Sequence, residues 1–385
     1  MNSATIREHS GPGRIIFGPG SVNRLPELMD TDKRVFLVTD PGLSKAGVLN
    51  TTTIVLSNAG ISYEVYDRVV PEAPLPSVEE AATEFKKSDC NALLAVGGGS
   101  AIDTAKAIGL LVSNPGNFLE YAKGRSLKNE IPYLVAVPTT AGTGSEVTDA
   151  TVVTDPKTST KMVVRGGKIL LPSIAILDPE LLRTLPLSTA AETGIDALSH
   201  ALEALVSKMS QPFADALALH AISLILKYLR RLVVNPADLE AAENMLIASN
   251  LAGQSFNNAG LGMVHGLAHP FGARFHVSHG KACALYLVNV MKFNMKFCAE
   301  KYSLAATVMG CDVKGVTELE AASKAIEKIE KLLNDIGLPR TYEQAGIAFE
   351  LKNEMIEQVM SMPARMINPR LAEPEDIREL FNALN

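Results

Sequence analysis

The sequence predicts a two-part protein, with an α/β N-terminal half followed by an all-helical C-terminal half. Two observations predict this division. Short apolar, β-branched runs alternate with helical patterns up to about Leu185, and beyond that point only helical patterns continue. In addition, 385 residues are too many for one ordinary domain and suit two. We therefore expect an α/β domain at 1–185 and a helical domain at 186–385, joined within the Pro-containing segment Asp178–Ser188.

The strands expected in the first half are short, and many end in Gly, Pro, Asp or Thr. They are Arg14–Phe17, Val35–Thr39, Tyr63–Tyr66, Ala92–Val96, Tyr133–Val137, Ala150–Thr154 and Ile174–Leu177. Helical patterns lie between them, for example at Ser77–Lys87 and Ala101–Val112. Such alternation is typical of a mostly parallel sheet with helices on both faces.

The helices expected in the second half follow one another without intervening strands. They are Ala190–Ser207, Pro212–Leu232, Leu239–Gln254, Lys281–Met295, Leu319–Ile336 and Glu350–Met362. We expect the functional site in a cleft between this half and the α/β half.

Composition excludes several classes of function. With 36 Lys and Arg against 42 Asp and Glu, the net charge is -6, which does not suit binding to nucleic-acid phosphates. No run of about 18 apolar residues predicts a membrane span, and Met1–Arg14 lacks the apolar core of a signal peptide. The four cysteines are scattered, so we expect reduced thiols in a cytoplasmic protein.

Two loops at the ends of expected strands are candidates for holding phosphates. Gly97-Gly98-Gly99-Ser100 follows one strand and opens a helix, so backbone N–H groups can approach a diphosphate and Ser100 can cap the helix. A plain tight turn is the alternative. The second loop, rich in Thr, Ser and Gly, runs from Pro138 to Glu146 after another strand. Because loops at carboxyl ends of parallel strands form ligand crevices, we favour binding over a solvated loop.

Asp40 ends a third strand and can accept hydrogen bonds from ribose hydroxyls while repelling a 2′-phosphate. A Thr-Asp-Pro-Gly turn explains the same residue equally well.

A metal site is indicated in the second half. Asp196 and His200 are four residues apart on an expected helix and share one face. Four more histidines follow within fifteen residues, at His265, His269, His276 and His279. One carboxylate with two or three imidazoles suits iron(II) or zinc. Spacing alone leaves open which of the four coordinate, and a solvated helix face is the alternative for Asp196 and His200.

Together these segments resemble the iron-containing (group III) alcohol dehydrogenases, collinearly from Phe17-Gly18-Pro19-Gly20 to Glu375-Asp376-Ile377. The GGGSxxDxxK element at Gly97–Lys106 and the DxxxH…HxxxH…H spacing from Asp196 to His279 carry the resemblance. It implies a Rossmann-like nucleotide-binding domain plus a helical metal-binding domain, as in dehydroquinate synthase. The implied activity is reversible hydride transfer between NAD and a small primary alcohol or aldehyde, assisted by a divalent metal, iron(II) or else zinc or manganese. A homo-oligomer is also implied.

The resemblance implies a role for each matching residue. The metal ligands would be Asp196, His200, His265 and His279, with His269 beside them as a catalytic proton relay. The residues that would hold the cofactor diphosphate are Gly98, Gly99, Ser100 and Asp103. Those that would line the phosphates and the nicotinamide ribose are Thr139, Thr140, Thr143 and Ser145, with Lys161 also on the cofactor side. Asp40 stands where members of the family that prefer NAD carry an acid.

The chain departs from the family pattern near the last histidine. The following helix commonly reads VANAxLLP, whereas here it begins Lys281-Ala282-Cys283, and the charged Arg274 and His276 lie close by. An anionic aldehyde is therefore an alternative substrate. The candidates for the substrate pocket are Thr151, Phe256, Leu261, Arg274 and Met366. Two other functions stay open, a metal- and NAD-dependent lyase of the dehydroquinate synthase kind and a non-catalytic binding protein.

Overall fold

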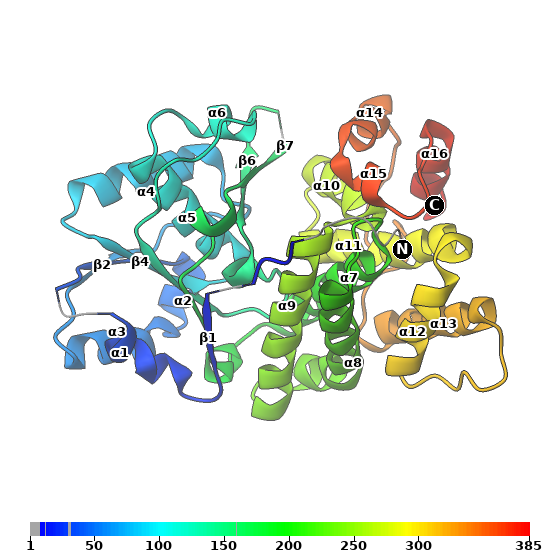
Figure 1. The fold of residues 1–385 in the computed structure, drawn as a ribbon, viewed down its shortest axis with the longest axis horizontal. Helices are drawn as coiled ribbons and strands as arrows, with labels where there is room; N and C mark the ends of the chain where they lie inside the picture. Colours follow the sequence, from blue (N-terminus) through cyan, green and yellow to red (C-terminus); the bar gives the residue numbers. More distant parts are fainter. Residues whose placement is uncertain (1–7, 12, 30–31, 159) are drawn as a thin grey trace. The chain divides into compact units, whose positions relative to one another are not determined.

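The computed structural model describes residues 8–11, 13–29, 32–158 and 160–385. Residues 1–7, part of the segment in which we expect no signal peptide, lie outside the described residues. The chain forms two compact units (Figure 1). Among the described residues, an α/β unit comprises those within 13–187 and 235–250, and a helical unit comprises 8–11, 188–234 and 251–385.

The α/β unit is built on a six-stranded sheet in which every neighbouring pair is parallel, in the order β1-β8-β5-β4-β2-β3. The strands are β1 (Arg14–Phe17), β2 (Val35–Val38), β3 (Tyr63–Tyr66), β4 (Ala92–Gly97), β5 (Tyr133–Pro138) and β8 (Ile174–Leu177). Because β2 leads to β3 on one side and β4 leads to β5 on the other, the chain direction across the sheet reverses between β2 and β4. Ligands of such sheets bind outside the strand ends at this point.

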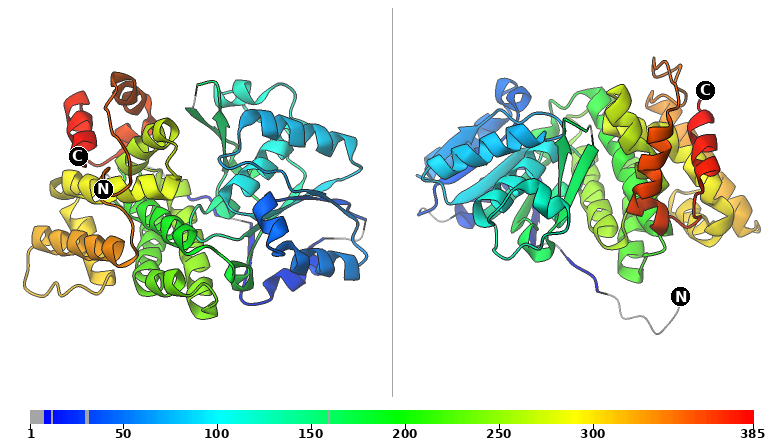
Figure 2. Two further views of the ribbon diagram at one scale, coloured as in Figure 1. Left: turned by 180° about the vertical axis from the view of Figure 1, so that it is seen from behind. Right: turned by 90° about the horizontal axis from the view of Figure 1, so that it is seen from above.

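Both faces of this sheet are covered, as the apolar character of its strands predicts (Figure 2). One face packs on apolar side chains of α4 (Leu75–Lys87) and α5 (Gly99–Ser113). The other packs on α1 (Leu25–Leu28) and α3 (Leu49–Asn58). The shorter helices of the unit are α2 (Pro41–Lys45) and α6 (Phe118–Ala122). The expected α/β class is confirmed.

One expected strand has a different place. The run Ala150–Thr154 is β6 (Ala150–Asp155), but it pairs antiparallel with β7 (Thr160–Arg165) in a separate two-stranded sheet. The sequence analysis placed it in the main sheet and missed β7. The two strands pair antiparallel because the connection between them has only four residues, which is enough for a hairpin but too short for a parallel crossover.

The helical unit contains no strand among its described residues, in agreement with the expectation. Its helices are α7 (Leu187–Val206), α8 (Pro212–Val234), α10 (Met263–Phe275), α11 (His279–Asn294), α12 (Ala299–Val308), α13 (Glu318–Asp335), α14 (Asn353–Ser361), α15 (Pro363–Ile367) and α16 (Pro374–Asn382). The long helix α9 (Leu239–Ala259) contributes residues to both units. The sequence analysis named no helix at the positions of α10, α12, α15 and α16. Within the described part of the chain, none of the helices has the length and apolarity needed to cross a membrane.

Candidate metal centre and cofactor loops

Four side chains of the helical unit converge on one point. Helix α7 supplies Asp196 and His200, α10 supplies His265, and α11 begins with His279. One ligand atom from each lies within 4.8 Å of all the others. The Asp196 Oδ1 atom is 3.5 Å from His200 Nε2 and 3.4 Å from the Nε2 atoms of His265 and His279. The sequence-predicted ligands are therefore brought together.

These separations fit a metal ion. A tetrahedral centre with bonds of about 2.0–2.1 Å places its ligand atoms about 3.3–3.4 Å apart. The three distances from Asp196 Oδ1 to the imidazole nitrogens, 3.4–3.5 Å, match this separation. Three of the four candidate ligand residues are also buried. The donor set of one carboxylate and three imidazoles suits iron(II), zinc or manganese.

The electrostatics of the cluster also favour a cation. Burial opposes ionisation of Asp196, but the three imidazoles hold the pKa of its carboxyl far below the usual range. Burial likewise opposes a charge on His265, yet Cys283, Glu203 and Asp196 together raise its pKa well above the ordinary value. A buried carboxylate that stays ionised needs a positive partner. Protons supply it when no metal is bound, so protons and metal compete for this site.

Glu203 holds His265 in the orientation that a ligand needs. It lies on α7, on the face of Asp196 and His200, and its buried carboxylate contacts His265 Nδ1. The other carboxylate oxygen accepts the backbone N–H of Val264 at 2.6 Å. With Nδ1–H donating to the carboxylate, Nε2 keeps its lone pair for the metal. Sequence analysis gave Glu203 no role, although its i, i+7 spacing from Asp196 could have indicated one.

A single glycine sets the distance between α11 and α7. A Cβ atom on Gly280 would lie 2.2 Å from the carbonyl oxygen of Glu192, so the two backbones approach more closely than any other residue allows. This approach brings His279, the neighbouring residue, next to Asp196, which lies one helical turn beyond Glu192.

The C-terminal segment supports the start of α10. The buried Asn368 side chain accepts the N–H of Met263 at 3.3 Å and the amide of Asn294 at 3.0 Å, and it donates back to Asn294 at 2.7 Å. The Asn368-Pro369-Arg370 element of the resemblance therefore ties the chain end to the helix that carries His265.

The other candidate side chains of the helical unit lie at different distances from the ligands. His269 is beside them, with its ring centroid 5.2 Å from that of His279 and 5.8 Å from that of His265. The Phe256 ring is 4.4 Å from that of His200. Leu261 is partly buried, whereas Arg274 and Met366 are exposed.

In the α/β unit, the two predicted phosphate loops pack directly against each other. A Cβ on Gly98 would lie 3.3 Å from Thr140 Oγ1, and one on Gly99 would lie 2.8 Å from Thr143 Cγ2. The loops follow β4 and β5, whose ends pair at Gly97 and Pro138. A side chain at Gly99 would force Thr143 to move, and one at Gly98 would press on Thr140. The arrangement leaves the N-terminus of α5 facing hydroxyl groups, as a diphosphate site needs.

Ser100 does not cap α5 as the sequence predicted. The helix begins at Gly99 with Gly98 as its N-cap and has no side-chain cap. Ser100 therefore lies in the first turn, where its hydroxyl accepts the N–H of Glu72 at 2.9 Å.

Asp40 caps the short helix α2. Its Oδ1 accepts the N–H groups of Gly42 at 2.8 Å and Leu43 at 3.1 Å, so the turn interpretation accounts for these contacts. This does not test the predicted contact with ribose.

A buried polar network fastens β6 to α5. The ammonium of Lys106 donates to the carbonyls of Thr148 at 2.7 Å and Ala150 at 2.8 Å. Asp103 accepts the N–H of Val152 at 3.3 Å, and its carbonyl accepts the Thr151 hydroxyl at 2.8 Å. Burial raises the pKa of Asp103 to about 6 and lowers that of Lys106 to about 8, and their mutual attraction opposes both shifts.

The remaining residues predicted to contact the cofactor are distributed over the same unit. Thr139 and Ser145 are buried in the loop after β5, and Lys161 lies on β7, 3.8 Å from a carboxylate oxygen of Glu72. The hydroxyl of Thr151, a candidate for the substrate pocket, is already bonded to the Asp103 carbonyl.

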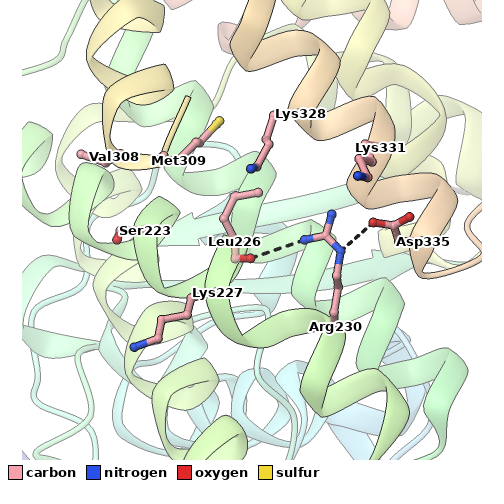
Figure 3. Close-up of a pocket in the computed structure, with 10 residues that line it drawn as sticks. Ser223, Leu226, Lys227, Arg230, Val308, Met309, Lys328, Lys331 and Asp335 are labelled. Carbon is pink, nitrogen blue, oxygen red and sulfur yellow. Dashed lines mark hydrogen bonds and ion pairs between the residues drawn. The ribbon is translucent and has the colours of Figure 1, made fainter. Parts of the chain in front are cut away.

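A separate hollow of about 430 Å³ lies in the helical unit, between α8 and α13 (Figure 3). Its basic side chains include Lys227, Lys328 and Lys331, and Arg230 donates to Asp335 at 2.7 Å. None of the candidate metal ligands lines it.

Comparison with known proteins identifies the family to which the α/β unit and the helical unit with its candidate metal ligands belong. The family model for the iron-containing alcohol dehydrogenase matches residues 12–179, and that for the Fe-containing alcohol dehydrogenase family, C-terminal, matches residues 190–385. The chain belongs to the iron-containing alcohol dehydrogenase family. It is 38% identical to a 1,3-propanediol dehydrogenase of Klebsiella pneumoniae over 96% of both chains. It is 36% identical to the lactaldehyde reductase of Escherichia coli K12, covering 95% of this chain and 96% of that one.

Among solved structures, the fold matches that of a 1,3-propanediol oxidoreductase with a TM-score of 0.93 and 37% identity, over 99% of this chain and 100% of that one. Membership of this family makes the protein an oxidoreductase that acts on CH–OH groups and interconverts alcohols and aldehydes.

Proposed function

We propose that this enzyme transfers hydride reversibly between NAD(H) and a small primary alcohol or aldehyde, with iron(II) as its metal. The observation that carries the proposal is the position of Asp196 Oδ1, 3.4–3.5 Å from three imidazole nitrogens in a chain of this family. Zinc or manganese fits the same donors. A bound divalent metal supplies Lewis-acid polarisation of the substrate oxygen, and a bound nicotinamide supplies or accepts the hydride.

The side chains of this protein bind and orient these groups. Asp196, His200, His265 and His279 hold the metal, and Glu203 keeps the Nε2 atom of His265 directed at it. The substrate oxygen would approach the bound metal beside these donors, which requires its coordination to expand beyond four. The fixed donors need no rearrangement during the reaction, which is how preorganised sites stabilise developing charge.

His269 moves the proton in this proposal. Oxidation of an alcohol releases the hydroxyl proton in addition to the hydride, so a base beside the substrate oxygen accelerates the reaction. The His269 ring lies 5.2 Å from that of His279 without belonging to the four-ligand cluster. One of its ring nitrogens accepts the proton and passes it to solvent.

The cofactor binds at the carboxyl ends of β2, β4 and β5. Gly98 and Gly99 allow the diphosphate to approach the start of α5, and the adjoining Thr140 and Thr143 hydroxyls donate to its oxygens. Ser100, Thr139, Ser145 and Lys161 complete the cofactor side. The resemblance also places Asp103 at the diphosphate. Because an ionised carboxylate would repel a diphosphate, we propose that Asp103 acts there indirectly, by accepting the N–H of Val152 and so anchoring β6 to α5. The acid at Asp40 favours NAD over NADP.

For the substrate, Phe256 beside His200 supplies an apolar wall, and Leu261 and Met366 are further candidates. Arg274 favours the alternative of an anionic aldehyde. We also propose a reducing compartment such as the cytoplasm, because all four cysteines are free thiols. The homo-oligomer implied by the family resemblance stays a prediction.

The proposal is tested by measuring NADH consumption with matched neutral and anionic aldehydes. We expect consumption in proportion to aldehyde reduced, and Arg274→Ala lowers kcat/KM for the anionic aldehydes alone if they are the substrates. Binding of NAD and metal without net NADH consumption would favour the lyase or the binding protein instead.

A further inference from the structure

A cysteine faces the metal ligands in this chain. Cys283 lies one turn after His279 on α11 and is completely buried. Its Sγ atom is 3.6 Å from Asp196 Oδ1, 3.8 Å from His279 Nε2 and 3.9 Å from His265 Nε2. The sulfur therefore contacts the ligand atoms of three of the four side chains that form the centre.

The other cysteines of the helical unit are placed differently. The buried thiol of Cys298 donates to the carbonyl of Asn294 at 3.3 Å, and that of Cys311 donates to the carbonyl of Lys324. Each of these thiols satisfies a backbone carbonyl of a neighbouring helix, α11 for Cys298 and α13 for Cys311. The Cys283 thiol instead donates to the carboxylate of Asp196 and lies against the two imidazoles, so its sulfur faces three of the candidate metal ligands.

The distances permit coordination by this sulfur. Zinc binds thiolate at about 2.3 Å and imidazole or carboxylate at about 2.0–2.2 Å. Separations of 3.6–3.9 Å between sulfur and the other donors then correspond to angles of roughly 110–130° at the cation, close to tetrahedral. Asp196, His265, His279 and Cys283 thus form a second four-donor set, which shares three members with the set that contains His200.

We propose that Cys283 is a thiolate ligand of the divalent metal and gives the centre a preference for zinc or cobalt over manganese. This inference rests on the proposed metal site and specifies its chemistry. On binding, the S–H bond breaks, the proton leaves to solvent and a metal–sulfur bond forms, with no change of oxidation state. One thiolate and one carboxylate neutralise a doubly charged cation, which suits a buried centre. Soft sulfur ligands bind zinc and cobalt better than manganese.

Cobalt(II) is the probe, because a thiolate bound to cobalt adds a charge-transfer absorption in the near ultraviolet. The comparison uses the full-length wild-type protein, Cys283→Ser, Cys283→Ala and, as the matched control, Cys298→Ser. We expect the absorption in the wild type and in Cys298→Ser, and its loss in both Cys283 variants. We also expect the ratio of zinc to manganese affinity to fall on the order of tenfold in Cys283→Ser and not in Cys298→Ser.

The outcomes separate this inference from the proposed function. Cobalt that binds with its visible d–d bands but without the charge-transfer absorption, in a protein that reduces aldehydes, overturns the sulfur ligand alone. Failure of cobalt, zinc and iron to bind overturns the metal site and this inference together. Because Cys283→Ala removes the sulfur without adding a polar group to the core, it provides the spectroscopic comparison if Cys283→Ser does not fold.

Discussion

Replacement of Glu203 by glutamine should weaken metal binding by about 10–100-fold, equivalent to about 1.4–2.8 kcal/mol. The two carboxylate oxygens of Glu203 accept from two donors, His265 Nδ1 and the Val264 N–H. A glutamine amide has only one oxygen, so it can accept from one of these donors while its NH₂ group faces the other. If the NH₂ group faces Nδ1, the imidazole proton moves to Nε2 and blocks the metal. If it faces Val264, a charge-assisted hydrogen bond of about 1.5–3 kcal/mol is lost. Both orientations give a loss in the same range.

The assay is a competition titration of zinc or iron(II) against a chromophoric chelator, with circular dichroism as the check on folding. Glu330→Gln is the matched control, because this carboxylate is also paired, with Lys292 and Arg340, but lies away from the ligands. An affinity of Glu203→Gln within twofold of the wild type, in a folded protein, would refute the role of Glu203 in orienting His265.

Four further predictions test other parts of the account. His269→Ala should lower kcat by roughly 10²–10⁴-fold with full metal content; loss of metal would make His269 a ligand. Gly280→Ala should reduce metal bound per chain, because its Cβ would lie 2.2 Å from the Glu192 carbonyl oxygen and push α11 from α7; unchanged metal content would contradict this. Asp40→Gly should raise kcat/KM for NADP relative to NAD at a stability cost of only a few tenths of a kcal/mol, since glycine is also a good N-cap; an unchanged ratio would assign Asp40 to capping alone. Lys106→Met should destabilise the protein by about 3–5 kcal/mol in urea unfolding, because it removes the buried cation that offsets the charge of Asp103 and leaves the Thr148 and Ala150 carbonyls without their donor. The pKa of Lys106 is about 8 in the folded protein and 10.5 in the unfolded chain, so between these pH values the unfolded chain binds more protons. The free energy of unfolding of the wild type therefore gains a contribution from Lys106 that rises with pH across this window. The Lys106→Met variant should lack this rise.

The convergence of the four candidate ligands could be predicted from the sequence, and the structure shows which contacts produce it. Asp196 and His200 share a helix face by spacing, but only the resemblance selected His265 and His279 from the four nearby histidines. The i, i+4 rule is local, whereas the convergence of α7, α10 and α11 depends on contacts such as that between Gly280 and Glu192. Such contacts join residues far apart in the sequence and leave no periodic pattern.

The errors also have local physical causes. The run Ala150–Thr154 has the composition of a strand in a parallel sheet, and composition does not distinguish that from a hairpin strand. Ser100 was assigned as a cap because serine favours that position, but the helix starts at Gly99, where the backbone needs close approach to Thr143. Glu203 contacts His265, and Cys283 contacts Asp196, only because their helices pack together. Their residue types alone therefore did not predict that they lie at the candidate metal centre.

The most direct test of the central claim is to remove the metal with a chelator under anaerobic conditions and follow NADH absorbance with small aldehydes before and after iron(II) is added. We predict no NADH consumption by the stripped protein, recovery on addition of iron(II), and no recovery in Asp196→Ala. Equal consumption with and without metal, or full activity of Asp196→Ala, would contradict a metal-assisted hydride transfer at this centre.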